Sequence, residues 1–176
     1  DIQVIARTMG MDGRISPKFL HPGPGYGGSC FPKDTRAVAA IGDEYGLDMS
    51  LIKEVISANE KQKLRVVEKI KESIGELKGK TVALLGLAFK PETDDVRESP
   101  AISIVRLLLS HKTVVKVHDP KAILNFRFFF NHEISYHNDE FETVKDADCV
   151  VILTEWNEYR NIDLGKFISY ISFSAR

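Results

Sequence analysis

From Gly79 onward the chain alternates short apolar runs with helical patterns, and no other feature of the sequence constrains the fold as strongly. The run Thr81–Leu85 is bounded by glycines and is typical of a strand buried on both faces. The elements that follow are predicted as a helix at 100–110, strands at 113–117 and 133–136, a helix at 139–145 and a strand at 148–153. Strands that alternate with helices predict a Rossmann-like, doubly wound parallel sheet.

Such sheets bind ligands beyond the carboxyl ends of their strands, where the strand order reverses. The segment Gly86–Arg97 follows the first predicted strand directly and therefore lies at such an end. Its opening residues lack the G-x-G-x-x-G pattern of a dinucleotide-binding turn. Phe89 and Lys90 instead offer an aromatic face and a cation for a phosphorylated nucleotide. The alternative is a plain strand-end turn with one exposed lysine, in which Arg97 and Glu98 form a simple ion pair.

The first part of the chain reads as helical. Helices are predicted at 2–9, at 32–45 and, the longest, at 48–74, and each is followed by a glycine. The long helix has apolar residues at both ends and a polar waist between them, Asn59-Glu-Lys-Gln-Lys63. This pattern favours a connector helix that contacts a different neighbour at each end. The predicted class is therefore α/β, with a helical segment followed by the sheet domain and a boundary near residue 77.

Composition excludes several classes of function. Of the 176 residues 43% are hydrophobic, which is enough for a core. The chain has 24 basic and 25 acidic residues, and this balance of charge makes nucleic acid and anionic membranes poor partners. Two cysteines form no disulfide framework, and Cys149 reads as a buried strand residue. The sequence has no signal-peptide pattern and no run of membrane-spanning length, so we expect a cytoplasmic protein. No metal site is predicted.

The segment His21–Arg36, HPGPGYGGSCFPKDTR, concentrates the residues that could carry chemistry. Pro32 can open a helix, which places Cys30 just before a helix N-terminus, where unpaired amides favour a thiolate. Lys33 adds a positive charge, and Asp34 is close enough to orient or deprotonate a water. The preceding glycines let the backbone approach a ligand closely. The segment thus combines a nucleophile, a cation, a carboxylate and a pliant loop.

Each of these residues also has an ordinary interpretation. Cys30 could be a small buried hydrophobe, Asp34 could serve only the helix dipole, and Lys33 could serve only solubility. Arg14 and Lys18 lie near the loop in sequence, and solvated surface charge is the default reading for both.

Three stretches together resemble a known family. They are GYGGSCFPKD at 25–34, LGLAFKPETDDVRESP at 85–100 and VVILTEWNEYR at 150–160. All three are similar to segments of the UDP-glucose/GDP-mannose dehydrogenase family, and they occur in that family's order across nearly the whole chain. The resemblance implies a C-terminal part of the central helical dimerisation domain at 1–77, which carries the active-site cysteine loop. It implies a UDP-sugar-binding Rossmann-like domain at 78–176, expected to be incomplete at its C-terminus.

The resemblance also implies a reaction. Family members oxidise the C6 alcohol of a nucleotide-bound sugar to a carboxylate and reduce two NAD in succession, which for UDP-glucose gives UDP-glucuronate. Cys30 matches the nucleophile that forms a thiohemiacetal and then a thioester, and Asp34 matches the carboxylate that activates the hydrolytic water. The residues that match cofactor contacts are Cys30, Lys33 and Arg97. Those that match substrate contacts are Arg14, Phe19, Leu20, His21, Pro22, Gly23, Gly27, Phe89 and Lys90.

The family further implies a homodimer through the helix 48–74, with Arg14 reaching into the partner subunit's site. Its NAD-binding domain precedes these motifs, so we expect the chain to be the C-terminal half of a dehydrogenase that does not turn over NAD alone. Two stretches depart from the family. The aromatic cluster Phe126–Phe130 is read as core or interface packing, and Arg176, in a divergent C-terminus, cannot be assigned the family's nucleotide-binding role.

Other functions remain open at this point. GDP-mannose and UDP-N-acetylmannosamine dehydrogenases use the same chemistry, although the motif Ser-Cys-Phe-Pro-Lys-Asp favours UDP-glucose. A non-catalytic nucleotide-sugar-binding or dimerisation fragment would leave Cys30 idle. A cysteine acyl transferase or hydrolase would need a histidine base, and only His21 is near in sequence.

Overall fold

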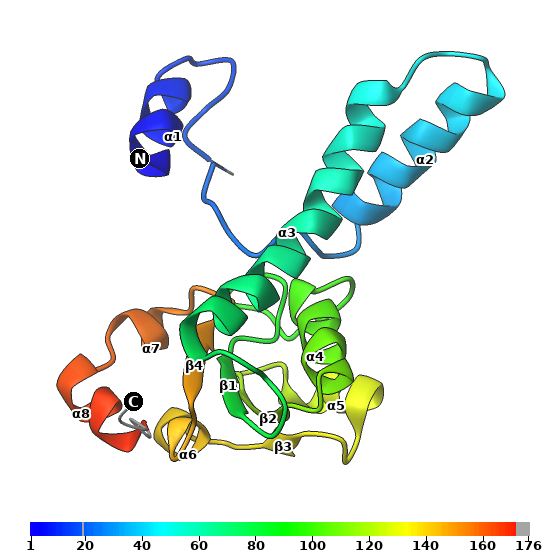
Figure 1. Ribbon diagram of the computed structural model, residues 1–176. Helices are drawn as coiled ribbons and strands as arrows, with labels where there is room; N and C mark the ends of the chain where they lie inside the picture. Colours follow the sequence, from blue (N-terminus) through cyan, green and yellow to red (C-terminus); the bar gives the residue numbers. More distant parts are fainter. Residues whose placement is uncertain (19, 172–176) are drawn as a thin grey trace.

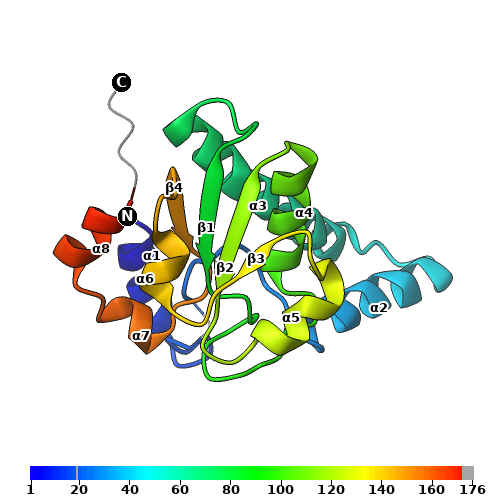
Figure 2. The same cartoon turned by 90° about the horizontal axis from the view of Figure 1, so that it is seen from below.

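The structure, a computed structural model, describes residues 1–18 and 20–171 and consists of a helical arm and an α/β unit (Figure 1). The arm is a hairpin of α2 (Phe31–Glu44) and α3 (Ser50–Ile74), and α1 (Ile2–Gly10) lies apart from this hairpin (Figure 1, Figure 2). The α/β unit contains β1 (Thr81–Leu85), α4 (Pro100–Ser110), β2 (Val114–His118), α5 (Ile123–Phe130), β3 (Ser135–Tyr136), α6 (Glu140–Val144), β4 (Cys149–Ile152), α7 (Asn157–Arg160) and α8 (Leu164–Tyr170). The α/β class with a long helix before a parallel sheet is confirmed.

The four strands form one parallel sheet in the order β3-β2-β1-β4. Val82 of β1 lies opposite Val115 of β2 on one side and opposite Cys149 of β4 on the other. The chain therefore proceeds outward from β1 to β3 and then returns to the far side of β1. The strand order reverses between β1 and β4, which is where sheets of this kind bind ligands.

Helices cover both faces of this sheet, and the core lies between the layers. Figure 2 shows α3 and α4 on one side of the sheet and α6 on the other. Val82, Leu84 and Leu85 of β1 are completely buried, as are Ile104 and Leu108 of α4. Continuous burial along β1 explains why its sequence is an unbroken apolar run instead of an alternating one.

The long helix α3 contacts different neighbours along its length. Its first half pairs with α2 to form a helical hairpin, and its second half packs against α4 and β4 (Figure 1). Val67 and Ile70 are buried where α3 meets the α/β unit. Asp48, predicted as the first helical residue, instead accepts a hydrogen bond from the N–H of Ser50 at 2.8 Å just before the helix begins. Among the described residues no helix has the length and apolar character needed to cross a membrane.

The aromatic cluster at 126–130 forms most of α5, which the sequence did not predict as a helix. Phe126 and Phe130 are buried in the core, which confirms the core-packing interpretation for these two. Phe128 instead faces outward and is 88% exposed. The helical period of α5 separates the two groups, because residues four apart share a face.

Candidate active site

The segment 21–30, called here the glycine loop, lies against the loop that leads from β1 to α4. The N–H of Gly28 donates to the carbonyl oxygen of Arg97 at 2.8 Å. A Cβ at Gly27 would lie 2.5 Å from the carbonyl oxygen of Glu98 and 3.1 Å from the Cβ of Phe89. Only glycine fits at position 27, and its absent side chain lets the glycine loop contact the backbone of the α/β unit.

The glycines at 23, 25 and 28 have the spacing of a dinucleotide-binding turn, but they lack its structural setting. That turn follows a strand within a βαβ unit. In the described part of the chain, no strand precedes β1, and the glycine loop leads from coil into α2. The spacing alone is therefore no evidence for a dinucleotide turn here.

Cys30 is the residue immediately before α2, as its sequence position predicts, and it is exposed. Its carbonyl oxygen accepts the helical hydrogen bond from the N–H of Asp34 at 2.8 Å, and its Sγ lies 3.7 Å from Ser29 Oγ. The free N–H groups of the first turn of α2 place positive partial charge beside this residue. Cys30 and Asp34 line one small hollow of about 290 Å³ with Phe31.

Two cations accompany the cysteine. Lys33 forms an ion pair with Asp34, and Arg97 forms one with Asp95 at 2.8 Å. The pKa of Lys33 is raised mainly by its hydrogen bond to Asp34, and the pKa of Arg97 mainly by its hydrogen bond to Asp95. The negative charge of an ionised Cys30 makes a smaller contribution to both. Both side chains therefore stay positively charged near the sulfur.

A cavity of about 940 Å³, called here the glycine-loop cavity, lies between the glycine loop, α3 and the end of β1. Its lining combines Lys18, His21, Gly23, Gly25, Tyr26, Gly27, Phe31, Val55, Ala58, Asn59, Phe89 and Lys90. The Nζ atom of Lys90 lies 5.4 Å from the centroid of the Phe89 ring. An aromatic face beside a cation suits a planar ring joined to phosphate groups, and the volume is at the upper end of ligand pockets.

A second cavity of about 630 Å³, called here the basic cavity, opens at Gly28 and Ser29. Five of its lining residues are cations and one, Glu98, is a carboxylate; the cations are Lys33, Arg36, Lys63, Arg97 and Arg106. Such an excess of positive charge attracts phosphate groups. Arg36 forms an ion pair with Glu98 at 2.8 Å, and Arg97 pairs with Asp95. The suggested ion pair between Arg97 and Glu98 is therefore wrong, because each has another partner.

The structure brings most of the predicted site residues together, but not all. The lysine and arginine assigned to the cofactor share the basic cavity, and five residues assigned to the substrate share the glycine-loop cavity: His21, Gly23, Gly27, Phe89 and Lys90. Leu20 and Pro22 belong to the same stretch of chain without lining it. Phe19 lies outside the described residues, as does Arg176.

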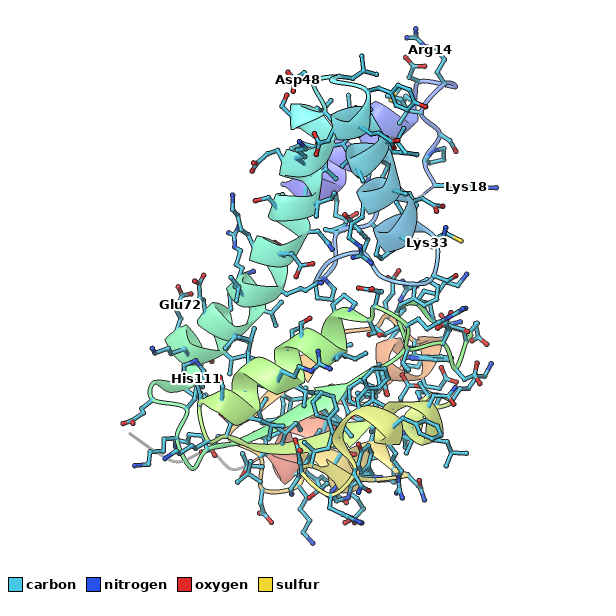
Figure 3. The ribbon with its side chains drawn as sticks, turned by 90° about the vertical axis from the view of Figure 1, so that its right-hand side faces the viewer. Arg14, Lys18, Lys33, Asp48, Glu72 and His111 are labelled. Atoms are coloured by element: carbon cyan, nitrogen blue, oxygen red, sulfur yellow. The ribbon has the colours of Figure 1, made fainter. Side chains whose placement is uncertain are left out.

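Arg14 is separated from the rest. Its side chain is 90% exposed and forms an ion pair with Asp12 at 2.6 Å. Figure 3 shows Arg14 pointing outward near the level of Asp48, whereas Lys33 lies closer to the α/β unit. Within one chain Arg14 therefore contacts neither cavity.

Asp119, which no sequence pattern singled out, fixes the loop that carries Phe89 and Lys90. Asp119 is buried at the end of β2, and its Oδ2 accepts hydrogen bonds from the N–H groups of Leu87 at 2.6 Å and Ala88 at 3.0 Å. The same oxygen accepts one from the indole of Trp156 at 3.2 Å, while Oδ1 accepts two from the turn 120–122. One carboxylate thus joins the ends of β1, β2 and β4. Its position two residues beyond the strand predicted at 113–117 was the only available signal.

Comparison with known proteins gives a consistent result. Residues 83–174 match the UDP-glucose/GDP-mannose dehydrogenase family, UDP binding domain, and residues 1–61 match the central domain of that family. UDP-glucose 6-dehydrogenase TuaD of Bacillus subtilis (strain 168) is 42% identical over 166 residues, which are 94% of this chain and 36% of that protein. UDP-glucose 6-dehydrogenase of Rhizobium meliloti (strain 1021) is 40% identical over 170 residues, 96% of this chain and 39% of that protein.

Among solved structures, a UDP-glucose dehydrogenase from the hyperthermophilic archaeon Pyrobaculum islandicum superposes with a TM-score of 0.87. It is 39% identical, and the match covers 91% of this chain and 37% of that one. The chain therefore spans less than two-fifths of the length of these relatives.

Proposed function

The chain belongs to the UDP-glucose/GDP-mannose dehydrogenase family, and we propose that it supplies the nucleophile and the nucleotide-sugar site of an NAD-dependent UDP-glucose 6-dehydrogenase. The observation that carries the proposal is the position of Cys30. Its neighbour Ser29 lines the basic cavity, and its other neighbour Phe31 lines the glycine-loop cavity. Cys30 itself lines the small hollow that it shares with Asp34, and the proposal places its sulfur between a sugar in one cavity and a cofactor in the other.

We assign the glycine-loop cavity to UDP-glucose. Lys90 supplies a cation for the diphosphate, Phe89 an aromatic face, and the backbone of Gly23 and Gly27 a close surface for the sugar and phosphates. The roughly 40% identity to proteins named UDP-glucose 6-dehydrogenase favours this sugar nucleotide over GDP-mannose or UDP-N-acetylmannosamine.

We assign to NAD the part of the basic cavity nearest Cys30. The fit rests on charge, because Lys33 and Arg97 are exposed cations that can pair with a pyrophosphate. When bound, NAD supplies the oxidant, taking up one hydride in each of two oxidations.

The protein's own residues carry the covalent steps. The first oxidation removes a hydride and a proton from the C6 alcohol and leaves an aldehyde. The Cys30 thiolate attacks this aldehyde, a C–S bond forms, and the carbonyl electron pair moves to oxygen to give a thiohemiacetal. Oxidation of this adduct leaves a thioester on Cys30. Water then adds to the thioester and gives a proton to Asp34, and the C–S bond breaks to release the carboxylate and the thiolate. The alcohol and one water thus yield a carboxylate, two hydrides and three protons.

A dimer through α3 completes the proposal. The hairpin of α2 and α3 exposes large apolar residues, among them Leu51, which is 76% exposed. A second copy packed there would cover this surface and bring Arg14 toward the partner subunit's site. A cytoplasmic location is proposed with the rest of the enzyme.

Calorimetric titration of the chain tests the assignment of the substrate. We expect UDP-glucose to bind at least about tenfold more tightly than GDP-mannose, which corresponds to about 1.4 kcal/mol. If GDP-mannose binds more tightly, the assignment of UDP-glucose as the substrate is wrong and GDP-mannose takes its place. Rapid alkylation of Cys30 at neutral pH would argue against a non-catalytic fragment, because an ordinary thiol reacts slowly there.

A further inference from the structure

Asn59 lies in the middle of α3, where an amide side chain is unfavourable. Asparagine is a weak helix former, and a buried amide costs free energy unless its polar atoms are bonded. Yet Asn59 is only 9% exposed and is part of the polar waist that interrupts the apolar pattern of α3. The position therefore has to be explained by what the amide contacts.

Its two polar atoms bind the two backbone polar groups of a single residue in the glycine loop. Oδ1 accepts a hydrogen bond from the N–H of Tyr26 at 2.7 Å, and Nδ2 donates one to the carbonyl oxygen of Tyr26 at 3.3 Å. One turn later, Nε2 of Gln62 donates to the carbonyl oxygen of Gly23 at 2.9 Å. The polar waist thus attaches the glycine loop to α3 by three hydrogen bonds.

The residue before Tyr26 is shaped to this contact. Gly25 has a φ of +132°, and a Cβ there would lie 2.9 Å from Asn59 Oδ1. A side chain at position 25 would be strained and would press on the amide. The contact therefore requires a glycine at position 25 of the loop as well as an asparagine at position 59 of α3.

An aromatic pair connects Tyr26 to the residue that follows Cys30. The ring of Tyr26 packs against that of Phe31, with centroids 5.8 Å apart. Phe31 is the first residue of α2 and directly follows Cys30. Asn59 also lines the glycine-loop cavity itself, together with Tyr26 and Phe31.

From these contacts we infer that Asn59 is a positioning residue, which holds the glycine loop in the shape that forms the glycine-loop cavity and thereby sets the position of Cys30, the last residue of that loop. The identity of that ligand as UDP-glucose rests on the proposed function. The anchoring of the loop by Asn59 does not depend on which ligand enters. Asn59 acts through Tyr26 and takes no part in the covalent steps.

Three variants of the chain separate this role from general stability. Asn59→Leu removes both hydrogen bonds at similar volume, and Asn59→Asp keeps the acceptor for the Tyr26 N–H but loses the donor. Lys61→Ala is the matched control, because Lys61 lies in the same waist, is exposed and pairs only with Glu54, at 3.2 Å, among the described contacts. The measurements are amide hydrogen exchange of Tyr26, exchange of Leu84 in the core of β1, and the dissociation constant for UDP-glucose.

In Asn59→Leu we expect Tyr26 exchange to accelerate at least tenfold while Leu84 exchange stays unchanged, and UDP-glucose to bind at least tenfold more weakly. Asn59→Asp should give intermediate exchange, and Lys61→Ala should change neither quantity. The inference is overturned if Tyr26 exchange stays at the wild-type rate, if Leu84 accelerates by the same factor, or if UDP-glucose affinity is unchanged despite faster Tyr26 exchange.

The outcomes also separate this inference from the proposed function. If the wild-type chain binds no UDP-glucose, the substrate assignment fails, and exchange alone then decides the role of Asn59. Selective acceleration at Tyr26 supports loop anchoring, and unchanged exchange overturns it.

Discussion

Gly28 donates its N–H to the carbonyl oxygen of Arg97 at 2.8 Å. Gly28 lies two residues before Cys30, and Arg97 lies in the loop that leads into α4. This bond joins the segment that carries the proposed nucleophile to the segment that carries a proposed cofactor ligand. A single backbone hydrogen bond contributes only about 1 kcal/mol, and the close fit of Gly27 against Glu98 and Phe89 adds to it.

Gly27→Ala tests this fit. The added methyl group would lie 2.5 Å from the carbonyl oxygen of Glu98, a backbone atom that cannot move away easily. We expect a loss of about 1–3 kcal/mol in unfolding free energy or a displaced loop, with UDP-glucose binding weakened by about tenfold or more. Denaturant titration and calorimetry measure the two effects.

Gly13→Ala is the matched control, because a Cβ at Gly13 meets no atom within 4 Å. It should leave affinity unchanged. Equal behaviour of the two variants would show that the glycine loop is not closely fitted to the α/β unit.

Asp119→Ala should be among the most destabilising substitutions in the α/β unit. It leaves five N–H donors without their acceptor in a buried site. We expect a loss of about 3–5 kcal/mol in unfolding free energy, measured by denaturant titration. Asp43→Ala, which breaks only the exposed ion pair with Lys53, should cost less than about 1 kcal/mol. Similar losses in both variants would contradict the role given to Asp119.

Stability should fall as pH is lowered through the range in which free histidine takes up a proton. Burial lowers the pKa of His118, whose Nδ1 lies 2.9 Å from the hydroxyl of Tyr159, and burial also lowers that of His137. The unfolded chain therefore binds protons at a higher pH than the folded one. The contribution of neutral His118 to the unfolding free energy is therefore present above 6.5, the usual pKa of histidine, and is lost as the pH falls below that value.

Denaturant titrations between about pH 7.5 and pH 5 measure this loss, since carboxylates titrate lower. In His118→Gln the slope of unfolding free energy against pH should be shallower over that range, with His137 supplying the remainder. An unchanged slope would contradict this assignment.

Leu51→Asp should dissociate the proposed dimer. Leu51 is exposed on α3 in a single chain, and burying a charge at an apolar interface is unfavourable. Sedimentation velocity should show a dimer for the wild-type chain and a monomer for this variant, while Glu54→Ala remains dimeric. A wild-type monomer at high micromolar concentration would remove the dimer from the proposal.

The sequence was sufficient to predict the elements that short-range rules determine. The apolar run of β1, the Ser99-Pro100 start of α4 and the placement of Cys30 before α2 each follow from short-range rules, and the structure has them at those positions. α5 was missed because a nearly unbroken aromatic run has no visible helical period. Only the burial of Phe126 and Phe130, four residues apart, reveals it.

The contacts that shape the candidate site could not be predicted, because they join distant parts of the chain. Asn59 and Tyr26 are 33 residues apart, and Asp119 and Ala88 are 31 apart. Arg97 was considered as a partner of its neighbour Glu98, whereas Arg36 approaches Glu98 from α2 and leaves Arg97 to Asp95. Spacing along the sequence does not determine such pairings.

Protection of Cys30 by substrate is the most direct test of the account. The chain is alkylated with iodoacetamide with and without saturating UDP-glucose, and labelling of each cysteine is followed by peptide mass spectrometry. Cys149 is the internal control, because it is half-buried in β4 and burial raises its pKa. The account predicts that UDP-glucose slows labelling of Cys30 at least about tenfold and leaves the slow labelling of Cys149 unchanged. Equal rates at Cys30 with and without UDP-glucose would contradict the claim that its sulfur faces the bound sugar.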